Sequence, residues 1–392
     1  MLKRLLELSR EGRLYYSIVQ HIRPYLQGFG YCFYDPARKI KLHAPQYVNP
    51  NPDEAPVVER IFRSFKLMKE KQKEADPVYL PSEAWQSTLD NAYAHVNDAA
   101  KRNDLSDFHM FLANSGCWKS SLGFEGGITI VAGSKSPLLN RYIRNAMFRK
   151  PFQVWNWYFG GRRDIEHLFA PNIGNQAGAW MNKRFVDANC FQNDILGSII
   201  SSSVSDFEKP VVADLGGGGG KTAAFTLRNL KNWSYLDFDL PEVVIVAAYY
   251  LMMSFPEKKV LLYGEEEYPV NHEKYDLIFM PAYEMSKAPH KSIDLFINRV
   301  SLGEMTKQTA LRYIDDICRA VRHFFFHMNH DGKLSRYHYS DGNRGPLAFE
   351  YPIPKEQFKL LFRYPDLGHI LRQGTIDFDE DVFMHLYERI SS

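Results

Sequence analysis

The 392-residue sequence lacks any apolar run of the roughly 18 residues that a membrane-spanning helix needs. Its N-terminus carries basic residues but no apolar core of a signal peptide. We therefore expect a soluble, cytoplasmic protein. Apolar residues make up 45% of the chain, which is enough to build hydrophobic cores and excludes an intrinsically disordered protein.

Cysteine and net charge are also scarce. The four cysteines, Cys32, Cys117, Cys190 and Cys318, are widely scattered, so neither a disulfide framework nor a cysteine metal site is predicted. A net charge of +2 gives no reason to expect a nucleic acid or an anionic membrane as partner. The oligomeric state stays open, and a homo-oligomer is compatible with the sequence.

What the chain does have is a run of five glycines at residues 216–220, directly after an apolar strand pattern. A loop without side chains lets the backbone approach a ligand closely, usually at the start of the next helix. A phosphate-binding P-loop would need glycine at position 215, where the chain has Leu215. A dinucleotide fingerprint that starts at Gly216 or Gly217 fails because Lys221 or Thr222 replaces its third glycine.

The same residues fit a third nucleoside-type ligand, S-adenosylmethionine. Its sites need a strand that leads into an acid-x-Gly-x-Gly sequence, then a helix, then a second strand that ends in an acid for the ribose hydroxyls. Asp214 and the glycine run supply the first part, and Asp239 ends the second strand pattern at residues 233–240. This is one strand–helix–strand unit. Asp237 is a rival ribose ligand because it points to the same face of the strand as Asp239.

Two motifs resemble known families. Asp214-Leu215-Gly216-Gly217-Gly218, followed by Phe238-Asp239-Leu240-Pro241, is similar to the class I methyltransferases, and residues 294–305 resemble a stretch of the bacterial sugar O-methyltransferase family. The resemblance implies a Rossmann-like α/β sheet, mostly parallel with an antiparallel last strand. It also implies S-adenosylmethionine as cofactor and S-adenosylhomocysteine as product. The implied cofactor-binding residues are Asp214, Gly216, Gly217, Gly218, Asp239, Leu240, Met280 and Asn298.

The length of the chain indicates about two domains. Residues 1–185 predict a mixed, mainly helical domain for substrate binding or oligomerisation, with one helix at 82–100. Residues 186–392 alternate strand and helix patterns, which is typical of a parallel sheet with right-handed crossovers, and form the predicted cofactor-binding domain. Residues 258–263 and 276–280 both predict strands, and the sequence does not decide which of them takes the third position in the sheet.

Methyl transfer to a hydroxyl needs a positioned acceptor and a base for its proton. Glu304 is one catalytic candidate, as the base or as a ligand for the acceptor hydroxyl; its alternative role is to interact with a helix dipole. His327 is the other candidate, with His330 as its alternative, since a spacing of three places them on opposite faces of a strand. A divalent metal lacks support, because these side chains have no tight ligand spacing.

The sequence therefore predicts an S-adenosylmethionine-dependent O-methyltransferase. The family resemblance points to a hydroxyl of a sugar or glycosylated acceptor, so the expected partner is a small molecule or a glycan. Three alternatives stay open: a methyltransferase with a non-sugar O- or N-acceptor, a methyltransferase-fold binding protein without turnover, and a phosphate-binding NTPase.

Overall fold

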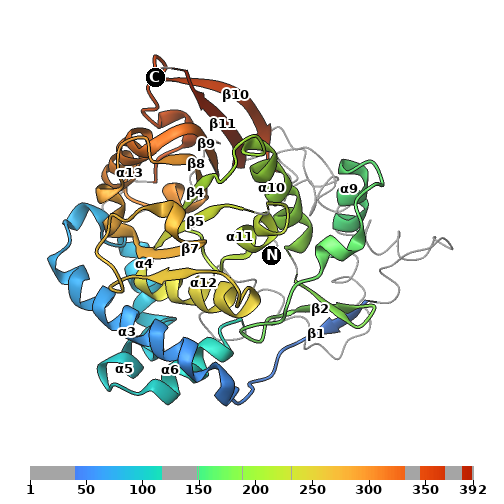
Figure 1. The fold of residues 1–392 in the computed structure, drawn as a ribbon, viewed down its shortest axis with the longest axis vertical. Coiled ribbons are helices and arrows are strands. Elements are labelled where there is room, and N and C mark those ends of the chain that lie inside the picture. The colour runs from blue at the N-terminus through green and yellow to red at the C-terminus, as the bar shows by residue number, and fades with distance from the viewer. Residues whose placement is uncertain are drawn as a thin grey trace, which may run out of the picture.

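The computed structural model describes residues 40–116, 148, 150–187, 189–230, 232–331, 345–366 and 382–390. The main feature of these residues is an eight-stranded sheet in the order β10-β11-β9-β8-β4-β5-β7-β6 (Figure 1). Its strands are β4 (Val211–Leu215), β5 (Ser234–Asp239), β6 (Val260–Leu262), β7 (Leu277–Pro281), β8 (Ile293–Arg299), β9 (Val321–His330), β10 (Phe358–Pro365) and β11 (Val382–Arg389).

Most of this sheet is parallel. Parallel pairing links β6 to β7, β7 to β5, β5 to β4, β4 to β8, and β8 to β9. The strand β11 pairs antiparallel with both β9 and β10. The prediction of a Rossmann-like, mostly parallel sheet with an antiparallel last strand is thus confirmed. The strand β7 takes the position next to β5, and β6 forms the edge, which answers the question that the sequence left open.

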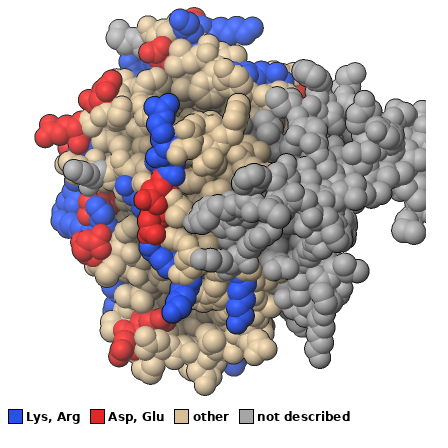
Figure 2. Space-filling model, turned by 90° about the vertical axis from the view of Figure 1, so that its right-hand side faces the viewer, with Lys and Arg blue, Asp and Glu red and all other residues tan. Residues whose placement is uncertain are grey.

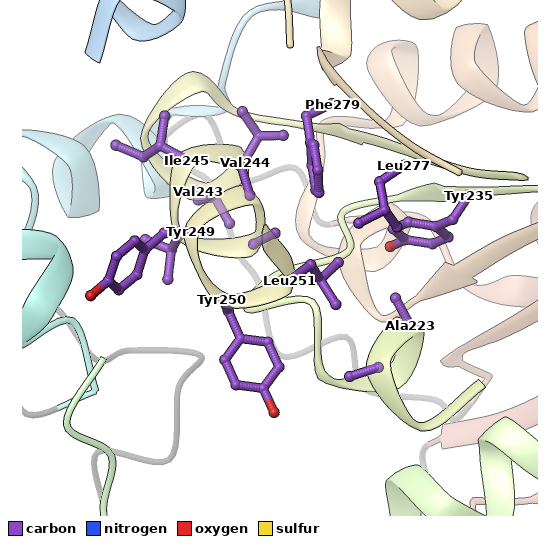
Figure 3. Packing of buried hydrophobic residues seen from close by; sticks show 14 of the residues in the cluster. Ala223, Tyr235, Val243, Val244, Ile245, Tyr249, Tyr250, Leu251, Leu277 and Phe279 are labelled. Atoms are coloured by element: carbon purple, nitrogen blue, oxygen red, sulfur yellow. The ribbon is translucent and has the colours of Figure 1, made fainter. Parts of the chain in front are cut away.

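Helices cover both faces of the sheet. They are α10 (Cys190–Ser203), α11 (Lys221–Leu227), α12 (Pro241–Ser254) and α13 (Lys307–Ala320). Because side chains alternate along a strand, Val212 of β4 packs in one hydrophobic cluster with α10, α11 and α12, whereas its neighbours Val211 and Ala213 pack in a second cluster with α13. Figure 3 shows the first cluster, in which side chains of α12 lie beside those of β5, β7 and α11.

The helix α3 (Ala55–Lys71), from the first part of the chain, packs on α12. The helices α5 (Ala94–Lys101) and α6 (Leu105–Ala113) pack on α3, and all three lie at the lower left in Figure 1. Phe65 of α3 and Phe108 of α6 are fully buried in the same hydrophobic cluster as α12 and the sheet. The division into two domains stays a prediction, but the described N-terminal helices share their core with the sheet.

The single helix predicted at residues 82–100 is wrong. Two helices occur there, α4 (Glu83–Asn91) and α5, and Tyr93 between them has the non-helical backbone angles φ −107° and ψ 7°. Tyr93 is 1% exposed and lies 6.1 Å from the ring of Phe111 in α6. Burial of this aromatic ring against a distant helix is a tertiary interaction, which overrides the local helical pattern.

Three short strands, β1 (Lys41–His43), β2 (Gly178–Met181) and β3 (Arg184–Asp187), form a separate antiparallel sheet. Trp155 of α9 (Lys150–Tyr158) belongs to the same hydrophobic cluster as buried residues of β2 and β3. In the part of the chain that the structure describes, every helix is too short or too polar to cross a membrane. On the face shown in Figure 2, basic and acidic side chains are interspersed.

Candidate active site

A cavity of about 360 Å³ lies at the carboxyl ends of β4, β5 and β8. The chain continues from β4 to one side of the sheet and later returns to the other side with β8. Open α/β sheets bind ligands at such a switch point. The glycine loop, α12, α13 and a segment of the N-terminal part, Tyr79 to Trp85, line the cavity.

The glycine loop brings backbone rather than side chains to this cavity. The N–H of Gly216 donates to the carbonyl of Phe238 on β5, 2.8 Å away. Gly218 has φ +62°, and a Cβ at this residue would have no heavy atom within 4 Å, so the backbone borders open space. A Cβ at Gly217 would come within 2.6 Å of Oδ1 of Asp237. Position 217 therefore needs glycine for packing, and position 218 needs it for its backbone conformation.

Asp239, at the end of β5, lines the cavity and is hydrogen-bonded to the glycine loop. Its Oδ2 accepts the N–H of Gly218 at 2.9 Å, and its Oδ1 accepts the N–H of Leu240 at 2.7 Å. Each carboxylate oxygen retains a second lone pair for a ligand hydroxyl. Burial raises the pKa of Asp239, although the two N–H groups act in the opposite direction. The predicted cofactor residues Asp239, Leu240 and Gly218 thus meet at one edge of the cavity.

Asp214 and Asp237 are register partners on β4 and β5. Asp214 lines the cavity, and its buried Oδ1 has no hydrogen-bond partner among the described residues. Burial, and then the charge of Asp239, raise the pKa of Asp214 to about 7, while the charge of Arg299 lowers it. Asp237 is fully buried, is not among the cavity-lining residues, and accepts the N–H of Gly217 at 3.3 Å. Between the two rival ribose ligands, Asp239 is therefore the one that borders the cavity.

Two other predicted cofactor residues lie behind the cavity wall. Asn298 is fully buried, and its amide donates to the Leu215 carbonyl at 2.8 Å and to Ser301 Oγ at 2.6 Å. Met280 is also fully buried, in the hydrophobic cluster that contains α13. Neither residue lines the cavity. Asn298 instead fixes the backbone that leads into the glycine loop, and Met280 contributes to the core.

Glu304 lines the cavity, and it is not the residue that opens the next helix. It ends the short 3-10 helix η9 (Ser301–Glu304), while the N-cap of α13 is Thr306, whose side chain accepts the Thr309 N–H. The indole N–H of Trp85, in α4, donates to Oε2 of Glu304 at 2.8 Å. A side chain from the N-terminal part of the chain therefore orients this carboxylate.

His327 lies elsewhere. It is fully buried, does not line the cavity, and stacks on His385 of β11 with 4.5 Å between ring centroids. Burial lowers the pKa of His327 well below its ordinary value, so the ring is neutral near pH 7. The alternative histidine, His330, lies against Gly303 in η9, where its Cδ2 would be 3.1 Å from an added Cβ. This geometry offers no support for His327 as a base at the cavity.

The cavity-lining side chains to which the sequence alone assigns no role include Trp85, Lys221 and Arg299. Lys221 directly follows the glycine run, and Arg299 directly follows Asn298 inside the second family motif. Their positions are therefore visible in the sequence, but only the folded chain shows that they face the same cavity. Among the described residues, no group of three or more His, Cys, Asp or Glu side chains could hold a metal ion.

No protein-family model matches this chain, and no curated protein matches it. Solved structures that it is similar to include the magnesium protoporphyrin IX methyltransferase of Synechocystis with bound S-adenosylmethionine, at 12% identity, 50% coverage of this chain, 79% of that chain and a TM-score of 0.33. The N-methyltransferase NodS of Bradyrhizobium japonicum, in complex with S-adenosylhomocysteine, is 13% identical; the match covers 50% of this chain and 87% of that chain, with a TM-score of 0.34. The [4+2]-cyclase SpnF is 15% identical; the match covers 64% of this chain and 96% of that chain, with a TM-score of 0.37. Likenesses this distant do not identify an activity.

Proposed function

We propose that this protein is an S-adenosylmethionine-dependent methyltransferase. The observation that carries the proposal is the position of Asp239, whose carboxylate borders the cavity at the end of β5 and accepts the N–H of Gly218. A carboxylate at the end of the second strand, beside a loop without side chains, suits the two vicinal hydroxyls of a ribose. The missing P-loop glycine at Leu215 argues against a triphosphate at the same loop.

The other lining residues fit such a donor. Open backbone at Gly218 leaves room for close approach, and the unpartnered Oδ1 of Asp214 is an acceptor that an ammonium group would satisfy. Leu240 and Val243 add apolar walls next to Asp239, which suit a purine ring. When bound, the donor supplies an already activated methyl group, so the protein mainly has to position the acceptor.

The proposed acceptor is a hydroxyl group beside Glu304. This carboxylate lies close enough to Asp239 for its charge to raise the pKa of Asp239. In the proposed role, Glu304 accepts a hydrogen bond from the acceptor hydroxyl and takes up its proton, while Trp85 keeps the carboxylate oriented.

We further propose that this hydroxyl belongs to a sugar. Trp85 and Tyr79 both line the cavity, and aromatic side chains pack well on the apolar faces of sugar rings. Glu304, which lines the same cavity, supplies the directional hydrogen bond that a sugar hydroxyl needs.

Two substitutions at matched carboxylates test the proposal. Titration calorimetry with S-adenosylhomocysteine is expected to show binding to the wild type and at least about tenfold weaker binding to Asp239→Ala, because hydrogen bonds to a charged group contribute ~1.5–3 kcal/mol. Glu304→Gln, at a second cavity carboxylate, is expected to keep the affinity. It is expected to slow transfer of labelled methyl from S-adenosylmethionine to a panel of sugars by about 100-fold or more.

Unchanged binding by Asp239→Ala, or tight binding of ATP to the wild type, would contradict the proposed donor site. An unchanged transfer rate in Glu304→Gln would remove Glu304 from the reaction. Transfer to amines but to no sugar would favour the alternative of a non-sugar acceptor, and donor binding without transfer to any acceptor would favour a binding protein.

A further inference from the structure

A second cavity, of about 700 Å³, lies outside the proposed donor site, and its size is typical of sites for small molecules. Its walls come from the 3-10 helix η6 (Ile165–Leu168), from β2 and β3, and from the carboxyl ends of α11 and α12. Among the described residues, none lines both cavities. Lys221 at the start of α11 lines the first cavity and Arg228 after its end lines the second, so the length of this helix, about 10 Å, lies between them.

One wall of the second cavity is aromatic and includes Phe169, Trp180 and Phe185. Trp180 of β2 and Phe185 of β3 are register partners, and their rings meet edge to face with 5.6 Å between centroids. Phe169 and Phe185 are buried, whereas Trp180 is only half-buried. An indole that neighbouring rings hold in place, and that is partly exposed, offers a flat surface for the apolar face of a sugar ring.

The charged side chains of this cavity leave one positive charge uncompensated. Arg184 forms an ion pair with Glu166. Arg228 instead donates from Nη1 to the carbonyl oxygen of His167 at 3.2 Å, and its Cζ lies 4.6 Å from the centroid of the Phe225 ring. Neither of these contacts of Arg228 brings a negative charge. The other N–H groups of its guanidinium form a fork that suits two oxygens of a carboxylate or phosphate.

The helix end itself accounts for only part of this charge. Arg228 is the C-cap residue of α11, where a cation is favourable because the helix dipole is negative. That dipole is equivalent to only about half an elementary charge, so part of the guanidinium charge remains for a ligand.

The same cavity holds a second polar group that needs a partner. Ser254, the last residue of α12, lines the cavity, and its buried Oγ has no hydrogen-bond partner among the described residues. A buried hydroxyl without a partner costs free energy, and an oxygen atom of a ligand would satisfy it.

We infer that this cavity binds an anionic sugar, meaning a sugar ring that carries a phosphate or carboxylate group. Arg228 binds the anionic group, Ser254 donates a hydrogen bond to an oxygen of the ligand, and the ring packs on Trp180. A sugar fits better than a planar base, because Trp180 offers one partly exposed ring rather than a slot between two. The inference does not depend on the proposed function, since the donor site lies in the other cavity.

Titration calorimetry of the full-length protein with a set of small probes tests the inference. Glucose 1-phosphate and glucuronate carry both a ring and an anionic group, whereas glucose lacks the charge and inorganic phosphate lacks the ring. At least one of the two charged sugars is expected to bind about tenfold or more tightly than glucose and than inorganic phosphate, because a charged hydrogen bond is lost in one case and the ring contact in the other. A preference between the two charged sugars identifies the anionic group.

Variants of the lining residues assign the binding to this cavity. Arg228→Met is expected to weaken the charged sugar by at least about tenfold. Trp180→Leu, which keeps an apolar side chain but removes the flat surface, is expected to weaken it by about two- to tenfold. Arg162→Met is the matched control, because Arg162 is an exposed arginine shortly before η6 that does not line the cavity, and its affinity is expected to equal that of the wild type.

Several results would overturn the inference: no binding of either charged sugar, equally tight binding of glucose, or wild-type affinity in Arg228→Met. Tighter binding of adenosine monophosphate than of both charged sugars would replace the sugar by a nucleotide. If Arg228→Met does not fold, Arg228→Lys takes its place, since it keeps the charge and loses the fork; a loss of affinity supports the inference, and an unchanged affinity contradicts it.

S-Adenosylhomocysteine separates this inference from the proposed function. At saturating concentration it is expected to change the affinity for the charged sugar by less than about twofold, because the two cavities share no described residue. Direct competition between the two compounds would place the charged sugar in the first cavity and refute the second site. If the charged sugar binds and S-adenosylhomocysteine does not, the proposed function fails while the second site stands.

Discussion

At the scale of single residues, the buried acids under the glycine loop determine the electrostatics of the site. Asp214, Asp237 and Asp239 are each 8% exposed or less. Burial raises the pKa of all three, and the charges of neighbouring carboxylates add to this effect. Because these effects disfavour the ionised form of the acids, a ligand that brings hydroxyl donors and a positive charge is expected to stabilise that form.

The raised pKa of Asp214 predicts a pH dependence of stability. The unfolded carboxyl ionises near the ordinary aspartate pKa of 3.8, and the folded one ionises near about 7. The contribution of the Asp214 carboxyl to the free energy of unfolding is therefore fully present below the unfolded pKa, and it is lost as the pH rises to about 7. Relative to the wild type, Asp214→Asn is expected to gain stability over this window, at most about 1.4 kcal/mol per pH unit, and to gain nothing further above it.

Urea unfolding of both proteins without ligand, between about pH 4.5 and about pH 8, measures this difference. The comparison cancels the contributions of the buried histidines, which are the same in both proteins. A constant difference across the whole pH range would contradict the raised pKa of Asp214.

At the scale of elements, the close contact of α10 and α11 positions the guanidinium of Arg299 at the cavity. A Cβ at Gly197 of α10 would lie 2.9 Å from the backbone carbon of Phe225 and 3.0 Å from the nitrogen of Thr226, both in α11. The first turn of α10 carries Gln192 and Asn193, which hold Arg299. The distance between the two helices thus sets the position of the guanidinium.

We expect Gly197→Ala to destabilise the protein by about 1–3 kcal/mol, because backbone atoms cannot yield as the end of a side chain can. Urea unfolding measures this change, with Ser198→Ala on the same helix as control. Because Arg299 lines the proposed donor cavity, the variant is also expected to bind S-adenosylhomocysteine more weakly than the wild type does. Wild-type stability of Gly197→Ala would show that the two helices separate at little cost.

At the scale of the whole molecule, the described N-terminal helices and the sheet form one hydrophobic core. Phe65 of α3 lies in the same cluster as α12 and β7. Polar contacts cross the same boundary: Arg60 forms two hydrogen bonds with Glu265, at 2.8 and 2.9 Å, and Lys69 pairs with the buried Glu242 at 2.7 Å. The N-terminal part also contributes Trp85, which orients Glu304. The site is therefore incomplete without it.

We expect these parts to unfold in a single transition. Phe65→Ala, in α3, is expected to lower the stability of the sheet as well, by about 3–5 kcal/mol. Far-ultraviolet circular dichroism and tryptophan fluorescence during urea unfolding are expected to give coincident curves for the wild type and the variant. A separate early transition, moved by Phe65→Ala while the second one stays in place, would show that the N-terminal helices are an independent domain.

Local patterns were sufficient for those features that depend on consecutive residues. The alternation of apolar strands and helices predicted the parallel sheet, and the final antiparallel strand followed from the family resemblance. The glycine run and Asp239 lie one strand–helix–strand unit apart, so a single crossover brings them together. The break between α4 and α5 was not predictable in this way, because Tyr93 is buried against a helix that begins more than ten residues later.

By itself, the sequence determined the class of sheet, the bend after β4 and the acid at the end of β5, since backbone preference and short-range connectivity decide these. Only the tertiary structure decided which polar side chains face the cavity. Glu304 meets Trp85 across 219 positions of the chain, Arg299 turns toward α10, and His327 points into the core. Such choices depend on strand register and on packing between distant segments, which no local pattern of residues encodes.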